Sequence, residues 1–140
     1  MPAIWFQSYT LEVIRERAVG TMAAHLGIEY VNLGENFLEG RMPVDARTHQ
    51  PEGILHGGAS VTLAETLASI SGNLVVDPAL EYCVGLEINA NHLRAVRDGH
   101  VLGRSSPVHL GRTTQVWETR IFQGERPVCI SRMTLAVLKR

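Results

Sequence analysis

The stretch that decides the fold lies between residues 56 and 76 and reads HGGASVTLAETLASISGNLVV. Small and apolar residues fill it, and Glu65 carries its one formal charge. A segment this apolar predicts a helix that is buried around most of its circumference. Its hydroxyl groups, Asn73 and Glu65 argue against a membrane span, which needs about 20 predominantly apolar residues. Because burying a lone carboxylate is costly, we expect a buried Glu65 to have a function.

The whole chain has the composition of a single globular domain covering residues 1–140, with 45% hydrophobic and 19% charged residues. Its net charge of −1 gives no basis for binding nucleic acid or an anionic membrane surface. Cys83 and Cys129 lie far apart in apolar runs, which predicts ordinary buried thiols. The N-terminal residues MPAIWF show no basic leader followed by an apolar run, so we expect a protein of the reducing cytoplasm.

Hydrophobic patterns on both sides of the central helix predict a sheet. A helix from about Leu11 to Val19, capped by Thr10, and a further turn over 21–26 come before it. We expect two strands before the central helix and four after it, at 28–33, 37–44, 82–91, 100–107, 113–123 and 126–138. This order has no βαβ alternation, so it predicts an α+β domain whose mostly antiparallel sheet curls around the helix.

Four motifs follow one another along most of the chain. They read QPEGILHGG at 50–58, AE at 64–65, VGLEINANHLR at 84–94 and PVHLGR at 107–112. Together they resemble the hotdog-fold thioesterases of the 4-hydroxybenzoyl-CoA and 1,4-dihydroxy-2-naphthoyl-CoA type, in the branch of the phenylacetic-acid-degradation thioesterases. The resemblance implies a hotdog fold and a homodimer with active sites at its interface, often doubled into a tetramer. It implies no metal and no cofactor, because coenzyme A is part of the substrate and product.

A helix that begins at His56-Gly57-Gly58 offers unpaired N–H groups and a partial positive charge. The Gly57 N–H is therefore a candidate donor to a thioester oxygen, and glycine lets the substrate approach closely. By resemblance, Gln50 orients the thioester and His56 contributes near the oxyanion or the leaving group. Glu65 would act as a nucleophile through a mixed anhydride or as the general base that activates water, and the sequence does not choose between these roles.

The spacing of Gly57 and Glu65 adds an inference about assembly. Eight residues separate them, which is about 12 Å along a helix at 1.5 Å per residue. A carboxylate is too short to cover that distance, so Glu65 hardly reaches a thioester held at Gly57 of its own chain. If both act on one carbonyl, they come from different subunits. Ser69, one turn beyond Glu65, or Thr62, one turn before it, could hold the carboxylate or the water.

Further residues are candidates for binding the coenzyme A part of the substrate. Arginine suits the phosphates, because the guanidinium forks onto phosphate oxygens. The candidates are Gly58, Asn91, His92, Arg94, His109 and Arg112. Arg97, in the loop that follows Arg94, is a further possibility.

The predicted activity is hydrolysis of aromatic or medium-chain acyl-CoA thioesters, in menaquinone biosynthesis or aromatic-acid metabolism. Two alternatives stay open: a hotdog hydratase or dehydratase, and a non-catalytic protein that binds or senses acyl-CoA. Trp5, Phe6 and Tyr9 either cover an edge of the core or border the acyl pocket.

Overall fold

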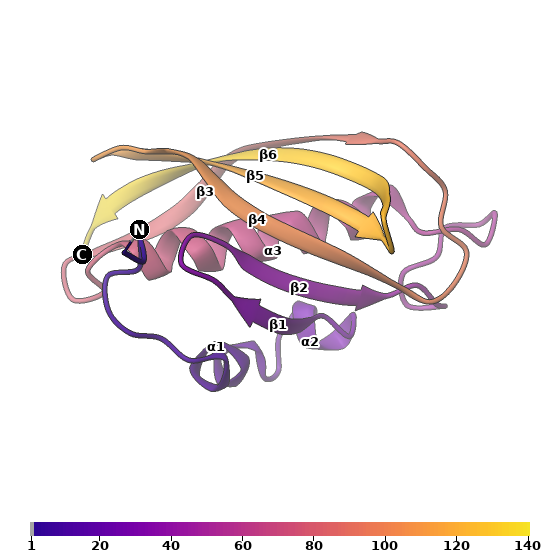
Figure 1. Cartoon of the computed structure of the whole chain (residues 1–140), viewed down its shortest axis with the longest axis horizontal. Coiled ribbons are helices and arrows are strands. Elements are labelled where there is room, and N and C mark those ends of the chain that lie inside the picture. Colours follow the sequence, from indigo (N-terminus) through magenta and orange to yellow (C-terminus); the bar gives the residue numbers. More distant parts are fainter. Residues whose placement is uncertain (1) are drawn as a thin grey trace.

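The predicted long helix is the centre of the fold. In the computed structural model, which describes residues 2–140, α3 spans Gly57–Val75 and a six-stranded sheet curls around it (Figure 1). Neighbouring strands are all antiparallel, in the order β1-β2-β4-β5-β6-β3. The strands are β1 (Glu29–Leu33), β2 (Leu38–Pro43), β3 (Glu81–His92), β4 (His100–Leu110), β5 (Thr114–Gln123) and β6 (Arg126–Lys139). The predicted α+β class and the curled antiparallel sheet are confirmed.

One side of α3 packs against the sheet through aliphatic and small side chains. Leu63 and Leu67 are fully buried there. Gly40 leaves room for this contact, because a methyl group on it would lie 2.8 Å from Leu67 Cδ2. Gly72 is equally constrained, since a methyl group on it would overlap the Leu135 side chain of β6. The glycines therefore let helix and sheet approach closely.

The opposite side of α3 carries Glu65. In the single chain Glu65 is exposed, so the expectation that this carboxylate is buried was wrong for one chain alone. The physical reason is that the described segments beside Glu65, among them β3 at Gly85, do not close over its carboxylate. The apolar character of α3 therefore overstated its burial within the monomer.

The strand predictions hold to within one or two residues except at the end of β4. That strand continues past Pro107 to Leu110. Proline has no N–H to donate, which made residue 107 look like a strand end. The pairing with β5 shifts register between Pro107 and His109, and this irregularity lets the strand continue.

The N-terminal region covers one edge of the core. Thr10 caps α1 (Leu11–Ala18) as predicted, and α2 (Met22–His25) forms the further turn. The Trp5 ring stacks on Trp117 with 6.4 Å between centroids, and the Trp5 Nε1–H donates to the Gly34 carbonyl at 2.8 Å. This confirms that Trp5 covers the core, and it lies away from the hollow beside Glu65.

β3 forms an edge of the sheet with one side unpaired. β6 pairs with it from Glu81 to His92, and no other strand of residues 2–140 does so. Its first part is tied to α3 by Asn73, whose Oδ1 accepts from the Cys83 N–H at 2.9 Å and whose Nδ2 donates to the Cys83 carbonyl at 3.3 Å. Beyond this point Leu86 is 62% exposed. A long uncovered edge of this kind is a surface on which another strand pairs.

Replacing Asn73 with alanine should lower the free energy of unfolding by about 2 kcal/mol, because the Cys83 N–H and carbonyl both lose a partner. Urea unfolding followed by circular dichroism measures this change. Asn36→Ala, in the exposed turn before β2, is the matched control and should change the free energy by less than about 0.5 kcal/mol. Equal, small changes in both variants would contradict the prediction.

Both cysteines are free and buried, as predicted. Burial and, secondarily, the nearby Glu81 carboxylate raise the pKa of the Cys83 thiol to about 11, and burial also raises the pKa of Cys129. Both therefore remain protonated thiols near neutral pH. None of the helices described for residues 2–140 is long and apolar enough to cross a membrane.

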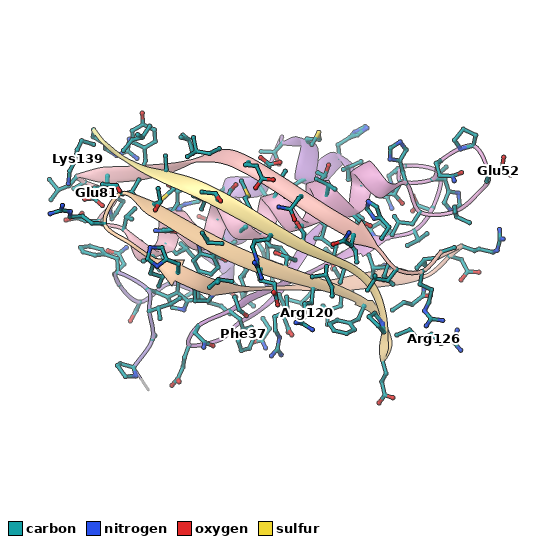
Figure 2. The ribbon with its side chains drawn as sticks, turned by 90° about the horizontal axis from the view of Figure 1, so that it is seen from above. Phe37, Glu52, Glu81, Arg120, Arg126 and Lys139 are labelled. Atoms are coloured by element: carbon teal, nitrogen blue, oxygen red, sulfur yellow. The ribbon has the colours of Figure 1, made fainter. Side chains whose placement is uncertain are left out.

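The two ends of the molecule carry different features (Figure 2). Glu81 and Lys139, joined by an ion pair of 2.6 Å, lie at the end where β3 begins and β6 finishes. Glu52 lies at the opposite end, in the loop that leads into α3. The N-terminus of α3 is therefore at the Glu52 end.

Candidate active site

The N-terminus of α3 presents a free backbone donor. His56 is the N-cap residue, and its Nδ1 accepts a hydrogen bond of 2.8 Å from the Gly58 N–H. The Ala59 and Ser60 N–H groups donate to the His56 carbonyl. Within residues 2–140 no group accepts from the Gly57 N–H. Because the helix dipole adds positive charge here, this N–H suits an oxygen that gains negative charge.

His56 keeps one ring nitrogen for other contacts. Since Nδ1 is the acceptor of the capping bond, a neutral His56 carries its proton on Nε2. The ring therefore offers Nε2–H as a donor while it caps the helix. Capping and a role in the site are compatible for this residue.

A hollow of about 440 Å³ lies at this helix end, and we call it the α3 N-terminal hollow. Of the predicted site residues, Gln50, Gly57, His92 and Arg94 line it together. A methyl group on Gly57 would lie 2.9 Å from His92 Nε2, so the His92 ring packs directly over this glycine. The structure therefore brings two predicted catalytic residues, Gln50 and Gly57, together with two predicted coenzyme A residues, His92 and Arg94.

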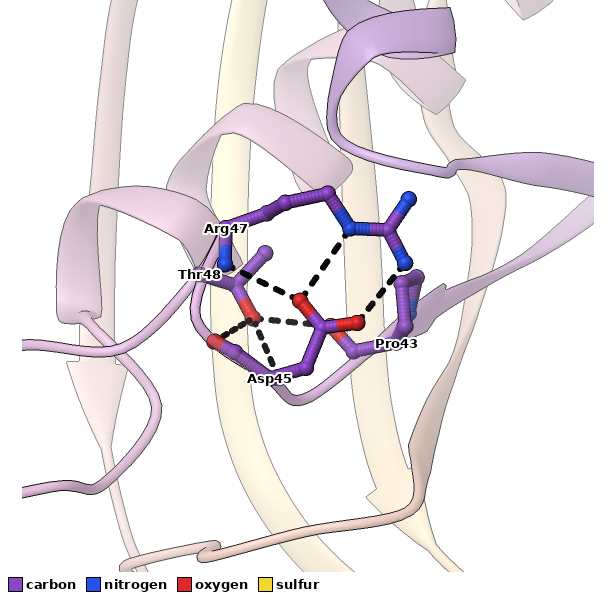
Figure 3. Close-up of polar contacts among 4 residues, drawn as sticks. All are labelled: Pro43, Asp45, Arg47 and Thr48. Atoms are coloured by element: carbon purple, nitrogen blue, oxygen red, sulfur yellow. Dashed lines mark hydrogen bonds and ion pairs between the residues drawn. The ribbon is translucent and has the colours of Figure 1, made fainter.

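The loop that carries Gln50 is held by local hydrogen bonds (Figure 3). Thr48 Oγ1 donates to the Pro43 carbonyl at 2.8 Å, and the Asp45 N–H donates to Thr48 Oγ1 at 3.2 Å. Hydrogen bonds from the Arg47 side chain and backbone lower the pKa of the Asp45 carboxyl to about 2. The His56 N–H donates to the Thr48 carbonyl at 2.8 Å, which joins the loop to the start of α3.

The side-chain amide of Gln50 has a defined orientation. Its Oε1 accepts from the Glu52 N–H. A backbone N–H can only donate, so the atom it meets is the oxygen and Nε2 is left as the free donor. The α3 N-terminal hollow is therefore lined by two residues with a free donor, Gln50 through its side-chain amide and Gly57 through its backbone N–H.

Glu65 and Ser69 line a different hollow of about 360 Å³, which we call the Glu65 hollow. Its wall is mostly apolar and comes from α1, α2, β1 and α3, including Ala18, Met22, Ala23, Tyr30 and Ile70. The sequence predicted Glu65 and Ser69 but not this wall. The residues of α1 and α2 carry no motif, and only the packing of these helices beside α3 brings them to Glu65.

The two hollows are separate on one chain, and no residue lines both. α3 is uninterrupted between Gly57 and Glu65, so the separation of about 12 Å expected from the helical rise applies. One chain therefore does not bring Glu65 to the donor at Gly57. Thr62 does not serve the Glu65 carboxylate either, because its Oγ1 donates to the Gly58 carbonyl at 2.9 Å.

The predicted coenzyme A residues do not gather in one place on the monomer. In the register of the sheet, His92 on β3 pairs with Cys129 on β6, which pairs with Ile121 on β5, which pairs with Gly103 on β4. His109 lies six residues further along β4, about 20 Å away at 3.3 Å per residue. Arg112 follows in the turn after β4, also remote from the α3 N-terminal hollow.

Of the remaining candidates, Gly58 donates to His56 and lies at the first turn of α3, while Asn91 is exposed on β3 beside His92. The Arg97 carbonyl is engaged by His49 Nε2 at 2.9 Å, and Arg97 does not line the α3 N-terminal hollow. No cluster of three His, Cys, Asp or Glu side chains that could hold a metal ion occurs in the described part of the chain.

Comparisons with known proteins give a consistent result. The family model described as "Thioesterase superfamily" matches residues 52–130. The proofreading thioesterase EntH of Cronobacter turicensis is 52% identical over 137 residues, which are 96% of this chain and 98% of that protein. The 1,4-dihydroxy-2-naphthoyl-CoA hydrolase of Escherichia coli is 47% identical, over 96% of this chain and 99% of its own length. The crystal structure of a Haemophilus influenzae thioesterase, 47% identical, superposes with a TM-score of 0.94 and covers 97% of this chain and 95% of that one.

Proposed function

Because this chain belongs to the thioesterase superfamily, we propose that it hydrolyses acyl-CoA thioesters in sites shared between the two subunits of a homodimer. The chain is a thioesterase with the hotdog fold, and both of these predictions are confirmed. The substrate, the roles of individual residues and the assembly are the proposal.

The observation that carries the proposal is the position of the two half-sites along β3. A methyl group on Gly85 would lie 3.2 Å from Glu65 Oε1, so Glu65 lies beside the first part of β3. Gly57 lies under His92, the last residue of β3. An antiparallel partner strand on the free edge, in the register that sets Gly85 of one subunit opposite His92 of the other, brings the two half-sites together. Glu65 then faces Gly57 of the partner subunit.

In such a site each group has a separate task. The Gly57 N–H and Gln50 Nε2 donate to the thioester oxygen and stabilise the negative charge that it gains. Glu65 from the other subunit adds to the carbonyl carbon as the C–S bond breaks, and water then hydrolyses the mixed anhydride. Alternatively, Glu65 takes a proton from a water that adds to the same carbon. Both routes give the free acid and the coenzyme A thiol.

The surroundings of the two half-sites support acyl-CoA as the substrate. Arg94, in the α3 N-terminal hollow, can bind a phosphate, and His56 Nε2–H can donate a proton to the leaving thiolate. The apolar Glu65 hollow suits an aromatic or medium-chain acyl group. A relative that hydrolyses 1,4-dihydroxy-2-naphthoyl-CoA favours an aromatic acid and a place in menaquinone synthesis. A cytoplasmic location agrees with the two free, buried thiols.

Thiol release from a panel of acyl-CoAs tests the proposal. The panel runs from short aliphatic through long-chain to hydroxybenzoyl and hydroxynaphthoyl thioesters. We expect at least one aromatic or medium-chain member to be hydrolysed with kcat/KM of about 10⁴ M⁻¹s⁻¹ or more. Tight binding of acyl-CoA without thiol release would favour the non-catalytic alternative. Addition of water to an enoyl-CoA without thiol release would favour a hydratase.

A further inference from the structure

The Tyr30 side chain is buried, and the protein leaves its hydroxyl group without a partner. The residue lies on β1 and is only 2% exposed. Its backbone carbonyl accepts from Arg15, but its hydroxyl makes no hydrogen bond within residues 2–140. A hydroxyl group with no partner in the protein pairs with water or with a ligand from outside the chain.

The Tyr30 hydroxyl is nevertheless not sealed. Only the Ser71 and Ser105 hydroxyls, among the described side chains, are both shut off from solvent and unpaired. Because the Tyr30 hydroxyl is also unpaired but is not one of these, its small exposed area reaches an opening. Tyr30 lines the Glu65 hollow together with Ala23 and Ile70, with which it shares a hydrophobic cluster, and it also lines a smaller hollow beside Arg15 and Glu29.

The rest of the hollow makes this hydroxyl distinctive. Ala18, Met22, Ala23 and Ile70 give its wall an apolar character. Thr66 and Ser69 are only half-buried, so water can satisfy their hydroxyls without a ligand. The other polar side chains of the hollow, Arg17, Thr21 and Glu65, are exposed to water. Burial raises the pKa of Tyr30, which keeps the phenol protonated and able to donate. Tyr30 is therefore the one buried residue with a polar side chain among those that line the hollow, and a fixed polar group of this kind can select a ligand by the ligand's own polar group.

We infer that Tyr30 is a specificity-determining residue whose hydroxyl hydrogen-bonds a polar substituent on the acyl group of the substrate. The inference rests on the proposed function, because the acyl group of a thioester attacked by Glu65 would enter the Glu65 hollow. The Tyr30 hydroxyl selects acyl groups that carry a ring hydroxyl over unsubstituted acyl groups of the same size. Tyr30 takes no part in breaking the thioester bond.

The test compares kcat/KM of Tyr30→Phe and of the wild type on benzoyl-CoA and its 2-, 3- and 4-hydroxy derivatives. It also uses naphthoyl-CoA with and without a ring hydroxyl. We expect Tyr30→Phe to lower kcat/KM about tenfold for at least one hydroxylated substrate and less than twofold for its unsubstituted partner. Thermal unfolding should occur close to the wild-type temperature, because the substitution removes a hydroxyl that has no partner in the protein. Tyr9→Phe, on the N-terminal segment outside the hollow, is the matched control.

Binding of non-hydrolysable thioethers separates this inference from the proposed function. Wild-type protein should bind hydroxyphenacyl-CoA more tightly than phenacyl-CoA, and Tyr30→Phe should lose that preference. If the preference is the same in both proteins, the role of Tyr30 is overturned even though hydrolysis continues. If thioethers bind with the predicted preference but no thioester is hydrolysed, the proposed function fails and the role of Tyr30 stands. If the wild-type protein binds neither thioether, both the proposed function and the role of Tyr30 are overturned.

Discussion

Replacing Glu65 with glutamine is expected to lower kcat for acyl-CoA hydrolysis by at least about 10³-fold, while the protein folds and assembles as before. Glutamine has nearly the same shape, but it is neither a nucleophile of comparable strength nor a base. In the single chain Glu65 is exposed and makes no hydrogen bond or ion pair with the described residues, so the fold does not depend on it. The change in the free energy of unfolding should therefore stay below about 0.5 kcal/mol.

Thiol release at saturating substrate, measured beside unfolding and sedimentation, tests the Glu65 prediction. Glu12→Gln, an exposed glutamate in the first turn of α1, is the matched control and should keep wild-type activity. A Glu65→Gln protein that retains more than about a tenth of the wild-type kcat would remove Glu65 from the chemistry. Loss of assembly in this variant would instead show that its carboxylate supports the interface.

The extent of the central helix was predictable because its limits depend on local chemistry. His56 and the two glycines after it favour a helix start, and Asp77-Pro78 prevents the helix from continuing. The end of β4 was not predictable in this way. Pro107 normally interrupts a strand, and only the register shift against β5 allows β4 to continue to Leu110.

The candidate site was predictable as a set of residues but not as a geometry. The motif around Gln50 and Gly57 places both donors at one helix end, since that depends on nearby parts of the chain. The exposure of Glu65 was missed, because an apolar helix can be covered by its own sheet or by a second chain, and the pattern is the same. The contribution of Tyr30 to the hollow was also missed, since it depends on how β1, α1 and α2 pack beside α3.

A heterodimer that carries Glu65→Gln in one subunit and Gln50→Ala in the other should regain about half of the wild-type activity. In a shared site, the unaltered Glu65 of the second subunit faces the unaltered Gln50 of the first, so one of the two sites is complete. Each parent homodimer has two defective sites and should be reduced by about 10²-fold or more. Co-expression with two different affinity tags and purification on both columns yields the heterodimer for a thiol-release assay.

Placing both substitutions in one subunit reverses the expectation and makes the test decisive. A doubly substituted subunit paired with a wild-type subunit has one site without Glu65 and one without Gln50, so a shared-site enzyme is inactive in this arrangement. If each chain holds its own complete site, the same heterodimer keeps half of the activity and the first heterodimer keeps none. The two arrangements contain the same substitutions in the same number, so differences in expression or stability affect both equally. The separation of about 12 Å between Gly57 and Glu65 on one straight helix predicts activity only when the substitutions lie on different subunits.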